Sequence, residues 1–269
     1  MKILTLNTHS WLEKNQKEKF NIFVDNILEE KYDIIFLQEV NQSISANKIE
    51  RKDKKIVELA RLKENNFGLL LKDELKSKGL NYYYTWDSTH IGYDIYDEGI
   101  AILSLNPILE VKSKIISSSV EYKSIETRKA TGIKIQYKNK DIWAFTLHFS
   151  WWKDGNFQYE WKKLREIINE IKADLFILAG DFNNDANIRN EGYDLVLKSG
   201  FYDSFNLAKE KIGEYTVESE IAGWKGDSSN KRIDFVFLSE EVGVKKYEVV
   251  FKDELQISDH LGVKVELEI

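Results

Sequence analysis

The sequence predicts a mixed α/β fold, and three observations support that class. Apolar runs of strand length recur along the chain, and segments with helical periodicity separate several of them. A chain of 269 residues is long for one domain, but it suits a single two-layer α/β sandwich and can bury a sizeable core. Strands are expected at Met1–Asn7, Asp33–Leu37, Tyr82–Trp86, Ile100–Leu103, Ile142–Leu147 and Leu175–Ala179.

Three segments between these strands carry patterns of their own. Asn47–Gly79 is charged and compatible with helix, with a partial apolar stripe from Ile56 to Leu62 and a second stripe from Phe67 to Leu75. Both stripes are most simply explained as core. Thr89–Gly99 is too polar and glycine-bearing for an interior strand, so a loop is predicted there. Asn156–Lys172 is predicted to be an amphipathic helix.

Several of the expected strands end in side chains that can bind a metal ion or transfer a proton. A packed sheet can present such groups to a cleft without burying them unpaired. Hydrolysis of a phosphate ester needs a hard cation, a water that can lose a proton, and a group that stabilises charge on a leaving oxygen. The pattern therefore indicates a metal-assisted hydrolase. The residues concerned are Asn7, Glu39, His148, Asp181, Asn183, Asp259 and His260.

Each of these residues also has a structural explanation. A carboxylate at a strand end is more often a turn residue or a helix cap, and a lone histidine is more often a satisfied structural residue. Gly180-Asp181-Phe182-Asn183 alone could be a strand followed by an Asx turn. The structural explanation does not account for so many such strand ends in one chain, so the functional interpretation is preferred.

Taken in order, six motifs resemble those of the endonuclease/exonuclease/phosphatase superfamily, the group of DNase I, exonuclease III, inositol polyphosphate 5-phosphatases and neutral sphingomyelinases. Each motif alone is weak, but their order is specific. The resemblance implies a DNase I-like fold of two packed β-sheets flanked by helices, with a magnesium site at one end of the sandwich. The motifs are Asn7, Leu37-Gln38-Glu39-Val40, Thr146-Leu147-His148, Gly180-Asp181-Phe182-Asn183, Arg232-Ile233-Asp234-Phe235 and Ser258-Asp259-His260.

The resemblance implies a set of metal ligands. Glu39 would be the principal ligand of Mg²⁺, with Mn²⁺ as an alternative, and Asn7 and Asp259 would lie beside it. An oxygen-rich site without cysteine suits such a hard cation. One position departs from the pattern, because several nucleases of the superfamily carry Asp two places after the first-strand Asn, where this chain has His9. The number of metal ions is therefore left open.

The resemblance also implies catalytic roles. Asp181 would orient or deprotonate the attacking water, and Asn183 would hold a phosphate oxygen. His260, oriented by the carboxylate of Asp234, and His148 would stabilise the pentacovalent phosphoryl group or protonate the leaving oxygen.

Candidates for substrate binding lie between the motifs. Thr89–Gly99 matches in position the loop that overhangs the active site in the superfamily, where His90 and Tyr93 would contact phosphate or the leaving group; a structural role for either is equally open. Exposed aromatic rings beside a catalytic histidine suit stacking on sugar rings or bases. The aromatic candidates are Trp151 and Trp152, which follow His148, and Trp224 in the segment Ile221–Asp227.

Arginine and lysine side chains are further candidates for binding a phosphate dianion. Arg128, Arg189 and Arg232 could each supply a fixed positive charge, and Lys153 a more mobile one. The alternative for each arginine is a surface or structural ion pair. Arg232 is weighted highest because it adjoins Asp234.

Composition limits the remaining possibilities. The chain has no cysteine, which excludes disulfides and thiolate metal sites, and only one proline, with no linker that would divide residues 1–269 into two domains. Met1 leads directly into a strand without an apolar signal segment, and no stretch approaches a membrane span. A single cytoplasmic domain without a membrane partner is therefore expected.

Net charge bears on the choice of substrate. The formal charge is −6 and the pI about 5.5, whereas a protein that follows a nucleic-acid backbone usually has a basic face. The basic run from Arg51 to Lys55 is most simply a solvated surface. Charge therefore argues against nucleic acid as the partner and favours a small phosphorylated substrate.

Further segments resemble a bacterial subgroup of the superfamily that includes maltose 6′-phosphate phosphatase. They are His90-Ile91-Gly92-Tyr93-Asp94 with Glu98-Gly99, Phe149-Ser150-Trp151-Trp152, Gly180-Asp181-Phe182-Asn183-Asn184-Asp185-Ala186 and Glu191-Gly192-Tyr193. The resemblance implies a magnesium-dependent phosphomonoesterase acting on a phosphorylated sugar such as maltose 6′-phosphate. The alternative is a magnesium-dependent nuclease or phosphodiesterase, and a noncatalytic binding module ranks below both because every core motif is present.

Overall fold

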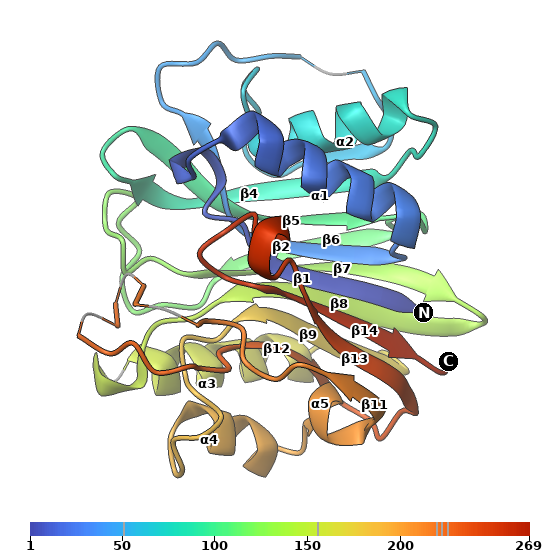
Figure 1. The fold of residues 1–269 in the computed structure, drawn as a ribbon, viewed down its shortest axis with the longest axis vertical. Helices are drawn as coiled ribbons and strands as arrows, with labels where there is room; N and C mark the ends of the chain where they lie inside the picture. Colours follow the sequence, from blue (N-terminus) through green and yellow to red (C-terminus); the bar gives the residue numbers. More distant parts are fainter. Residues whose placement is uncertain (51, 155, 219, 222, 225) are drawn as a thin grey trace.

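The strands of this chain form two sheets that pack face to face, with helices on their outer faces (Figure 1). The computed structural model describes residues 1–50, 52–154, 156–218, 220–221, 223–224 and 226–269. Arg51, Ala222 and Lys225, which belong to segments discussed above, lie outside these residues. The predicted fold of two packed β-sheets flanked by helices is confirmed.

The first sheet is built around the N-terminal strand. β1 pairs with β2 in parallel and with β14 in antiparallel orientation, so both ends of the chain meet in its centre. In the described residues its eight strands are, in spatial order, β11 (Ala208–Ile212), β13 (Val244–Val250), β14 (Gly262–Leu267), β1 (Lys2–Asn7), β2 (Ile34–Ser43), β5 (Tyr96–Ser104), β4 (Tyr83–Gly92) and β3 (Ile56–Glu58).

The second sheet places three strand ends side by side. In the described residues its six strands are, in spatial order, β10 (Tyr202–Asp203), β12 (Asp234–Leu238), β9 (Leu175–Asp181), β8 (Lys140–His148), β7 (Lys129–Tyr137) and β6 (Glu110–Ile115). Asp181, the last residue of β9, pairs in register with His148 on one side and with Asp234 on the other. Three residues that are far apart in the sequence therefore become neighbours.

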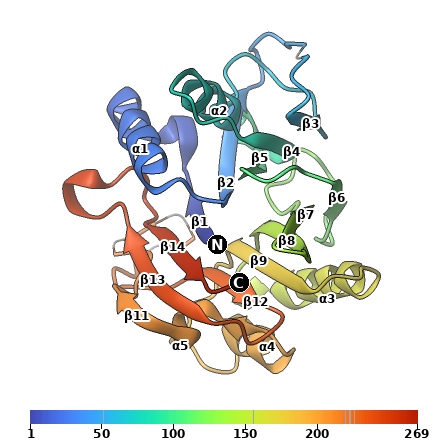
Figure 2. The same cartoon turned by 90° about the vertical axis from the view of Figure 1, so that its right-hand side faces the viewer.

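Helices cover both outer faces. They are α1 (Gln16–Glu30), α2 (Phe67–Ser77), α3 (Asn156–Asn169), α4 (Gly192–Lys198) and α5 (Ser204–Leu207), with single 3₁₀ turns at Ser10–Leu12, Trp152–Asp154 and Asp253–Leu255. Figure 2, turned by 90°, keeps α1 and α2 above the sheets and α4 and α5 below them. Among the described residues, none of the helices has the length and apolar character needed to span a bilayer.

The core consists of three layers of apolar side chains, because neighbouring residues on a strand face opposite sides of the sheet. Ile3 points between the two sheets, whereas Leu4 points toward the helices above. On the far side, Phe145 and Phe237 pack against residues of α3 and α4. Strands that are buried on both faces explain the continuous apolar runs in the sequence.

Two predictions about secondary structure are wrong. Of Asn47–Gly79, only α2 is helical, and it begins where the Asn66 side chain accepts a hydrogen bond from the Leu69 amide at 2.9 Å. Ile56 instead pairs with Tyr84 as part of the edge strand β3. Thr89–Gly99 is no loop but the end of β4, a short turn and the start of β5. Its polar residues arise because this hairpin borders a cavity rather than the core.

The remaining strand predictions are confirmed, and several strands extend beyond the predicted runs. A buried polar network links the two sheets behind the ends of β1 and β9. The Gln38 amide donates to the Thr146 hydroxyl at 3.0 Å, and that hydroxyl donates to the Leu37 carbonyl at 3.3 Å. Such a satisfied network fixes how the two sheets meet, and so it fixes the relative positions of the strand ends.

Candidate active site

The strand ends surround a cavity of about 540 Å³ at one end of the sandwich. Most of the predicted site residues line it. Those that do are Glu39, His90, Tyr93, Arg128, His148, Trp151, Asp181, Asn183, Asp259 and His260, joined by His9, Gly92, Glu98, Ile125, Glu126, Ser150, Asn156 and Ile221. Of the other predicted site residues, Asn7 and Asp234 lie directly behind this lining and contact it through hydrogen bonds.

One wall of the cavity is a group of carboxylates around Glu39. Glu39 sits where the register of β2 shifts, and its φ of 51° is in the left-handed region, which turns its side chain out of the sheet pattern. Burial and the nearby carboxylates of Glu98 and Asp259 raise the pKa of Glu39 to about 8. Because these acids repel one another, the wall is suited to a cation.

Asn7 joins this wall to the carboxylate of Asp181. Its side-chain amide donates to Glu39 Oε1 at 2.9 Å and to Asp181 Oδ2 at 3.2 Å. The Ser258 hydroxyl donates to the Asn7 carbonyl at 2.7 Å, which fixes the segment that carries Asp259 against the end of β1. Carboxylate and amide oxygens without any thiolate form a donor set that fits Mg²⁺ or Mn²⁺.

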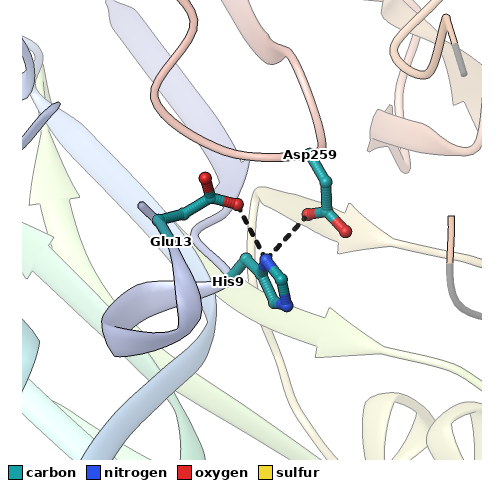
Figure 3. Close-up of side chains that lie close together, drawn as sticks. All are labelled: His9, Glu13 and Asp259. Atoms are coloured by element: carbon teal, nitrogen blue, oxygen red, sulfur yellow. Dashed lines mark hydrogen bonds and ion pairs between the residues drawn. The ribbon is translucent and has the colours of Figure 1, made fainter. Parts of the chain in front are cut away.

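His9 lies between two carboxylates at the edge of the same wall. Figure 3 shows its Nδ1 atom directed at both, 2.7 Å from Glu13 Oε1 and 3.8 Å from Asp259 Oδ1. Burial opposes protonation of His9, but the hydrogen bond to Glu13 and the charges of Asp259 and Glu39 raise its pKa to about 8. A protonated His9 would partly neutralise the negative charge of this wall. Several nucleases of the superfamily carry an Asp at this position.

Asp181 lies at the centre of the site, and backbone geometry places it there. The preceding residue, Gly180, has a φ of 146°, and a Cβ atom on it would lie 1.9 Å from the Leu147 carbonyl oxygen, so only glycine permits β9 to approach β8 this closely. Asp181 Oδ1 accepts a hydrogen bond from the backbone amide of Asn183 at 2.8 Å. Burial and the nearby Asp234 raise the pKa of Asp181 to about 7, against the opposing charge of His260.

Two histidines approach the same oxygen of Asp181. The Nε2 atoms of His148 and His260 lie 3.6 Å and 3.7 Å from Asp181 Oδ2. Burial alone would lower the pKa of His260, but Asp234, whose Oδ2 lies 2.9 Å from its Nδ1, and Asp181 raise that pKa well above its ordinary value. Burial and the nearby Arg128 hold the pKa of His148 well below its ordinary value.

Sequence reasoning assigned no role to Glu98, although it lines the cavity. Its carboxylate Oε1 lies 3.1 Å from His90 Nε2, and both side chains are buried. The residues face each other as a pair of the β4–β5 hairpin. The signal for Glu98 was the motif Glu98-Gly99, but only the hairpin register shows that it meets His90.

The segment after His148 is fixed by buried polar groups. Glu160 of α3 accepts hydrogen bonds from the amide and the hydroxyl of Ser150 at 2.9 Å and 2.6 Å. The side-chain amide of Asn183 donates to the Phe149 carbonyl at 2.9 Å, and so it also supports this segment. The wall that carries Ser150 and Trp151 is therefore rigid.

The three tryptophan candidates divide. Trp151 lines the cavity, and its ring lies so close to Gly223 (φ 83°) that a Cβ atom there would be 2.1 Å from the indole. Trp152 packs against Phe157, and Trp224 packs with the small cluster near Ile221, so neither lines the cavity. The two aromatic segments thus meet, but of the three candidates only Trp151 lines the cavity.

Arg232 is a correction to the sequence analysis. The residue is 3% exposed, and its guanidinium lies 2.6 Å from Asp203 Oδ2 and rests over the rings of Tyr193 and Phe235. It belongs to a structural cluster and does not reach the cavity, because Asp203 and the rings take its positive charge. Arg189 is exposed and paired with Asp194 at 2.7 Å, and Lys153 does not line the cavity either.

Comparisons with known proteins identify the family and the fold of this chain. Residues 12–260 match the profile of the Endonuclease/Exonuclease/phosphatase family. An endonuclease/exonuclease/phosphatase family protein from Leptotrichia buccalis C-1013-b is 32% identical, with 100% of both chains covered and a TM-score of 0.88. No curated protein matches the chain significantly.

Two more distant structures share the fold alone. Mannosyl-6-phosphatase of Bacteroides thetaiotaomicron VPI-5482 is 17% identical, with 100% of both chains covered and a TM-score of 0.70. Truncated TDP2 of Caenorhabditis elegans is 16% identical over 99% of this chain and 96% of its own, with a TM-score of 0.64. The family profile and the 32% identical structure decide the assignment: this chain belongs to the endonuclease/exonuclease/phosphatase family.

Proposed function

We propose that this chain is a metal-dependent phosphomonoesterase that acts in the cytoplasm on a phosphorylated sugar, such as a disaccharide 6′-phosphate. The observation that carries the proposal is the position of Asp181. It lies between a histidine whose pKa is raised and one whose pKa is lowered, opposite a wall of carboxylates. That combination supplies a base, a fixed positive charge and a cation site within one cavity.

The carboxylate wall is the proposed metal site, with Glu39, Asp259 and the amide oxygen of Asn7 as ligands. When bound there, Mg²⁺ or Mn²⁺ would stabilise negative charge on the phosphoryl group. The donor chemistry fits such an ion: burial and the carboxylates of Glu98 and Asp259 raise the pKa of Glu39, and the charged group that opposes them is His9 rather than a lysine or an arginine. A buried group of acids with this arrangement is stabilised by a divalent cation.

Asp181 is the proposed general base. A carboxyl whose pKa lies near 7 is about half ionised at neutral pH and still basic enough to take a proton from water. The amide of Asn7 and the backbone amide of Asn183 hold its two oxygens in place. Asn183 itself has a φ of 50°, a conformation that local structure must support, as at many functional sites.

The two histidines are proposed to act on the phosphoryl group and the leaving oxygen. Protonated His260, held by Asp234, would donate a hydrogen bond from Nε2 to a phosphoryl oxygen and stabilise its developing charge. His148 is neutral at pH 7, so it would act as a hydrogen-bond partner rather than as a charge.

The choice of a sugar phosphate rests on the cavity and on charge. Exposed Tyr93 and the ring of Trp151 border a volume that suits a small ligand, and aromatic rings pack well against the C–H faces of sugars. The formal charge of −6 opposes long nucleic-acid partners. A mannosyl-6-phosphatase with the same fold supports the proposal by analogy.

The test is phosphate release from a panel of sugar phosphates, nucleotides, inositol phosphates and a DNA duplex, with Mg²⁺ and with excess chelator. We expect Mg²⁺-dependent release from a disaccharide phosphate, loss of that release in Glu39→Gln, and full release in Glu166→Gln, which changes an exposed acid on α3. Cleavage of the duplex without any sugar phosphate turnover would replace this proposal by the nuclease alternative.

A further inference from the structure

Arg128 is a buried cation for which the described residues supply no ion-pair partner. It is 6% exposed and lines the cavity, yet its Nε atom has no hydrogen-bond partner, and within the described part of the chain its guanidinium forms no ion pair. Taking an unpaired charge out of water costs several kcal/mol, so such a side chain usually awaits a ligand of opposite charge.

The other buried cations show that this chain normally pairs such charges. Each has a carboxylate within 3.2 Å of its nitrogen. Among the described residues they are Lys63 with Asp97, Lys72 with Asp53, Lys231 with Asp227, Arg232 with Asp203 and Lys264 with Glu30. Arg128 is the exception, and it is also the one that faces the cavity.

The backbone around Arg128 is held firmly, so the guanidinium is presented from a fixed point. Its amide donates to the Ser117 hydroxyl at 2.8 Å, and its carbonyl accepts from the Ile116 amide at 3.0 Å. It directly precedes β7, whose Ala130 pairs with Leu147 of β8, so it lies beside the strand end that carries His148. A positive group therefore stands on the wall adjoining the catalytic histidine.

We infer that Arg128 binds the phosphate of the substrate and selects a phosphomonoester over a phosphodiester. The inference rests on the proposed function. A guanidinium presents several N–H groups in one plane and matches two oxygens of one phosphate. A monoester offers three nonbridging oxygens and nearly two negative charges at neutral pH, whereas a diester offers two nonbridging oxygens and one negative charge. Because Arg128 adds a fixed positive charge and a planar set of donors to the cavity, it favours the monoester, which carries more charge and one more free oxygen.

The test compares Arg128→Met, Arg128→Lys and the control Arg189→Gln, whose arginine is exposed and paired with Asp194. Binding of inorganic phosphate and of dimethyl phosphate is measured by calorimetry in Mg²⁺. We expect Arg128→Met to weaken phosphate binding by about 10- to 100-fold and dimethyl phosphate binding by less than about threefold. Arg128→Lys should fall between, because lysine keeps the charge and loses the planar fork.

Thermal unfolding separates this role from a structural one. Removing an unpaired buried charge should leave the Tm of Arg128→Met equal to or above that of the wild type, although phosphate then no longer raises it. A lower Tm together with unchanged phosphate binding would assign Arg128 to the fold and overturn the inference. If the methionine variant does not fold, Arg128→Lys provides the same comparison.

The outcomes distinguish this inference from the proposed function. Suppose that the wild type releases phosphate from monoesters and that Arg128→Met binds and turns over monoesters equally well. This result would refute the inference about Arg128, and the proposed function would stand. Suppose instead that the wild type releases no phosphate but binds it, and that Arg128→Met no longer binds phosphate. This result would support the anion site at Arg128 and refute the proposed function. Equal losses for phosphate and dimethyl phosphate would leave Arg128 as a phosphate ligand but reject the selection of monoesters.

Discussion

The two sides of Asp181 carry the same residue type in opposite electrostatic states. His260 and His148 are both buried, and each lies within 3.7 Å of the same carboxylate oxygen. His260 has a second carboxylate behind it, Asp234, which raises its pKa. His148 has Arg128 nearby instead, which adds to burial in lowering its pKa. Asp234 and Asp181 together favour the charged form of His260, whereas burial and Arg128 favour the neutral form of His148.

This difference predicts separate tasks for the two histidines. A fixed imidazolium is suited to stabilise charge on a phosphoryl oxygen, and a neutral imidazole is suited to exchange a hydrogen bond without adding charge. The comparison can be tested by changing the shared carboxylate, the partner of one histidine, a buried ion pair away from the site, and the carboxylate wall.

Asp181→Ala should have the largest effect, because it removes the group that both histidines face. We expect kcat/KM for phosphate release to fall by about 1000-fold or more, since general base catalysis commonly contributes that much. The circular dichroism spectrum should stay unchanged. The matched control is Asp185→Asn, which changes a buried acid of the same loop that does not line the cavity. Near-normal turnover of Asp181→Ala would refute its assigned role.

Asp234→Asn should affect only the His260 side. Because Asp234 raises the pKa of His260, the variant should lower that pKa. His260 then loses its proton at a lower pH, so the alkaline limb of the activity profile should move to lower pH. We expect kcat/KM at neutral pH to fall by about 100-fold. The pH profile and an NMR titration of the imidazole check this, and an unshifted alkaline limb would mean that the His260 charge is not required.

Asp203→Asn tests whether Arg232 is structural, as its pairing indicates. Breaking a buried ion pair by removing one partner leaves a buried charge, so unfolding free energy should fall by about 3 kcal/mol. Urea unfolding measures this loss. Because the pair lies away from the cavity, kcat/KM per folded molecule should be unchanged. A large loss of kcat/KM at full stability would restore the predicted contact between Arg232 and phosphate.

Metal binding should depend on pH through Glu39. The pKa of this carboxyl is raised from 4.5 to about 8, so its contribution to stability is present below 4.5 and is lost as the pH rises toward 8. A cation that binds the ionised form offsets this loss. Mg²⁺ should therefore raise the Tm more at pH 8 than at pH 6, by a few degrees, with the dependence removed in Glu39→Gln. An equal Mg²⁺ effect at both pH values would show that another group controls binding.

The arginines show where sequence reasoning reached its limit. Arg232 was preferred as a phosphate ligand because it adjoins Asp234, but it precedes β12, which begins at Asp234. Its guanidinium pairs with the buried carboxylate of Asp203 instead of lining the cavity. Arg128 and Arg232 look equivalent in the sequence, and only their packing shows that one is paired and the other is not. The local sequence pattern predicts that a residue lies at the end of a strand, but it does not predict which charged side chain will pair with that residue.

The sequence by itself determined the strands that form continuous apolar runs, the order of the motifs and the placement of polar groups at the ends of those strands, because apolar periodicity and residue type are local properties. Tertiary structure alone decided the pairings. It set Glu39 at a register shift, joined His90 to Glu98 across a hairpin, and left Arg128 unpaired. These features depend on strand register and on neighbours far apart in the chain, which no local pattern encodes.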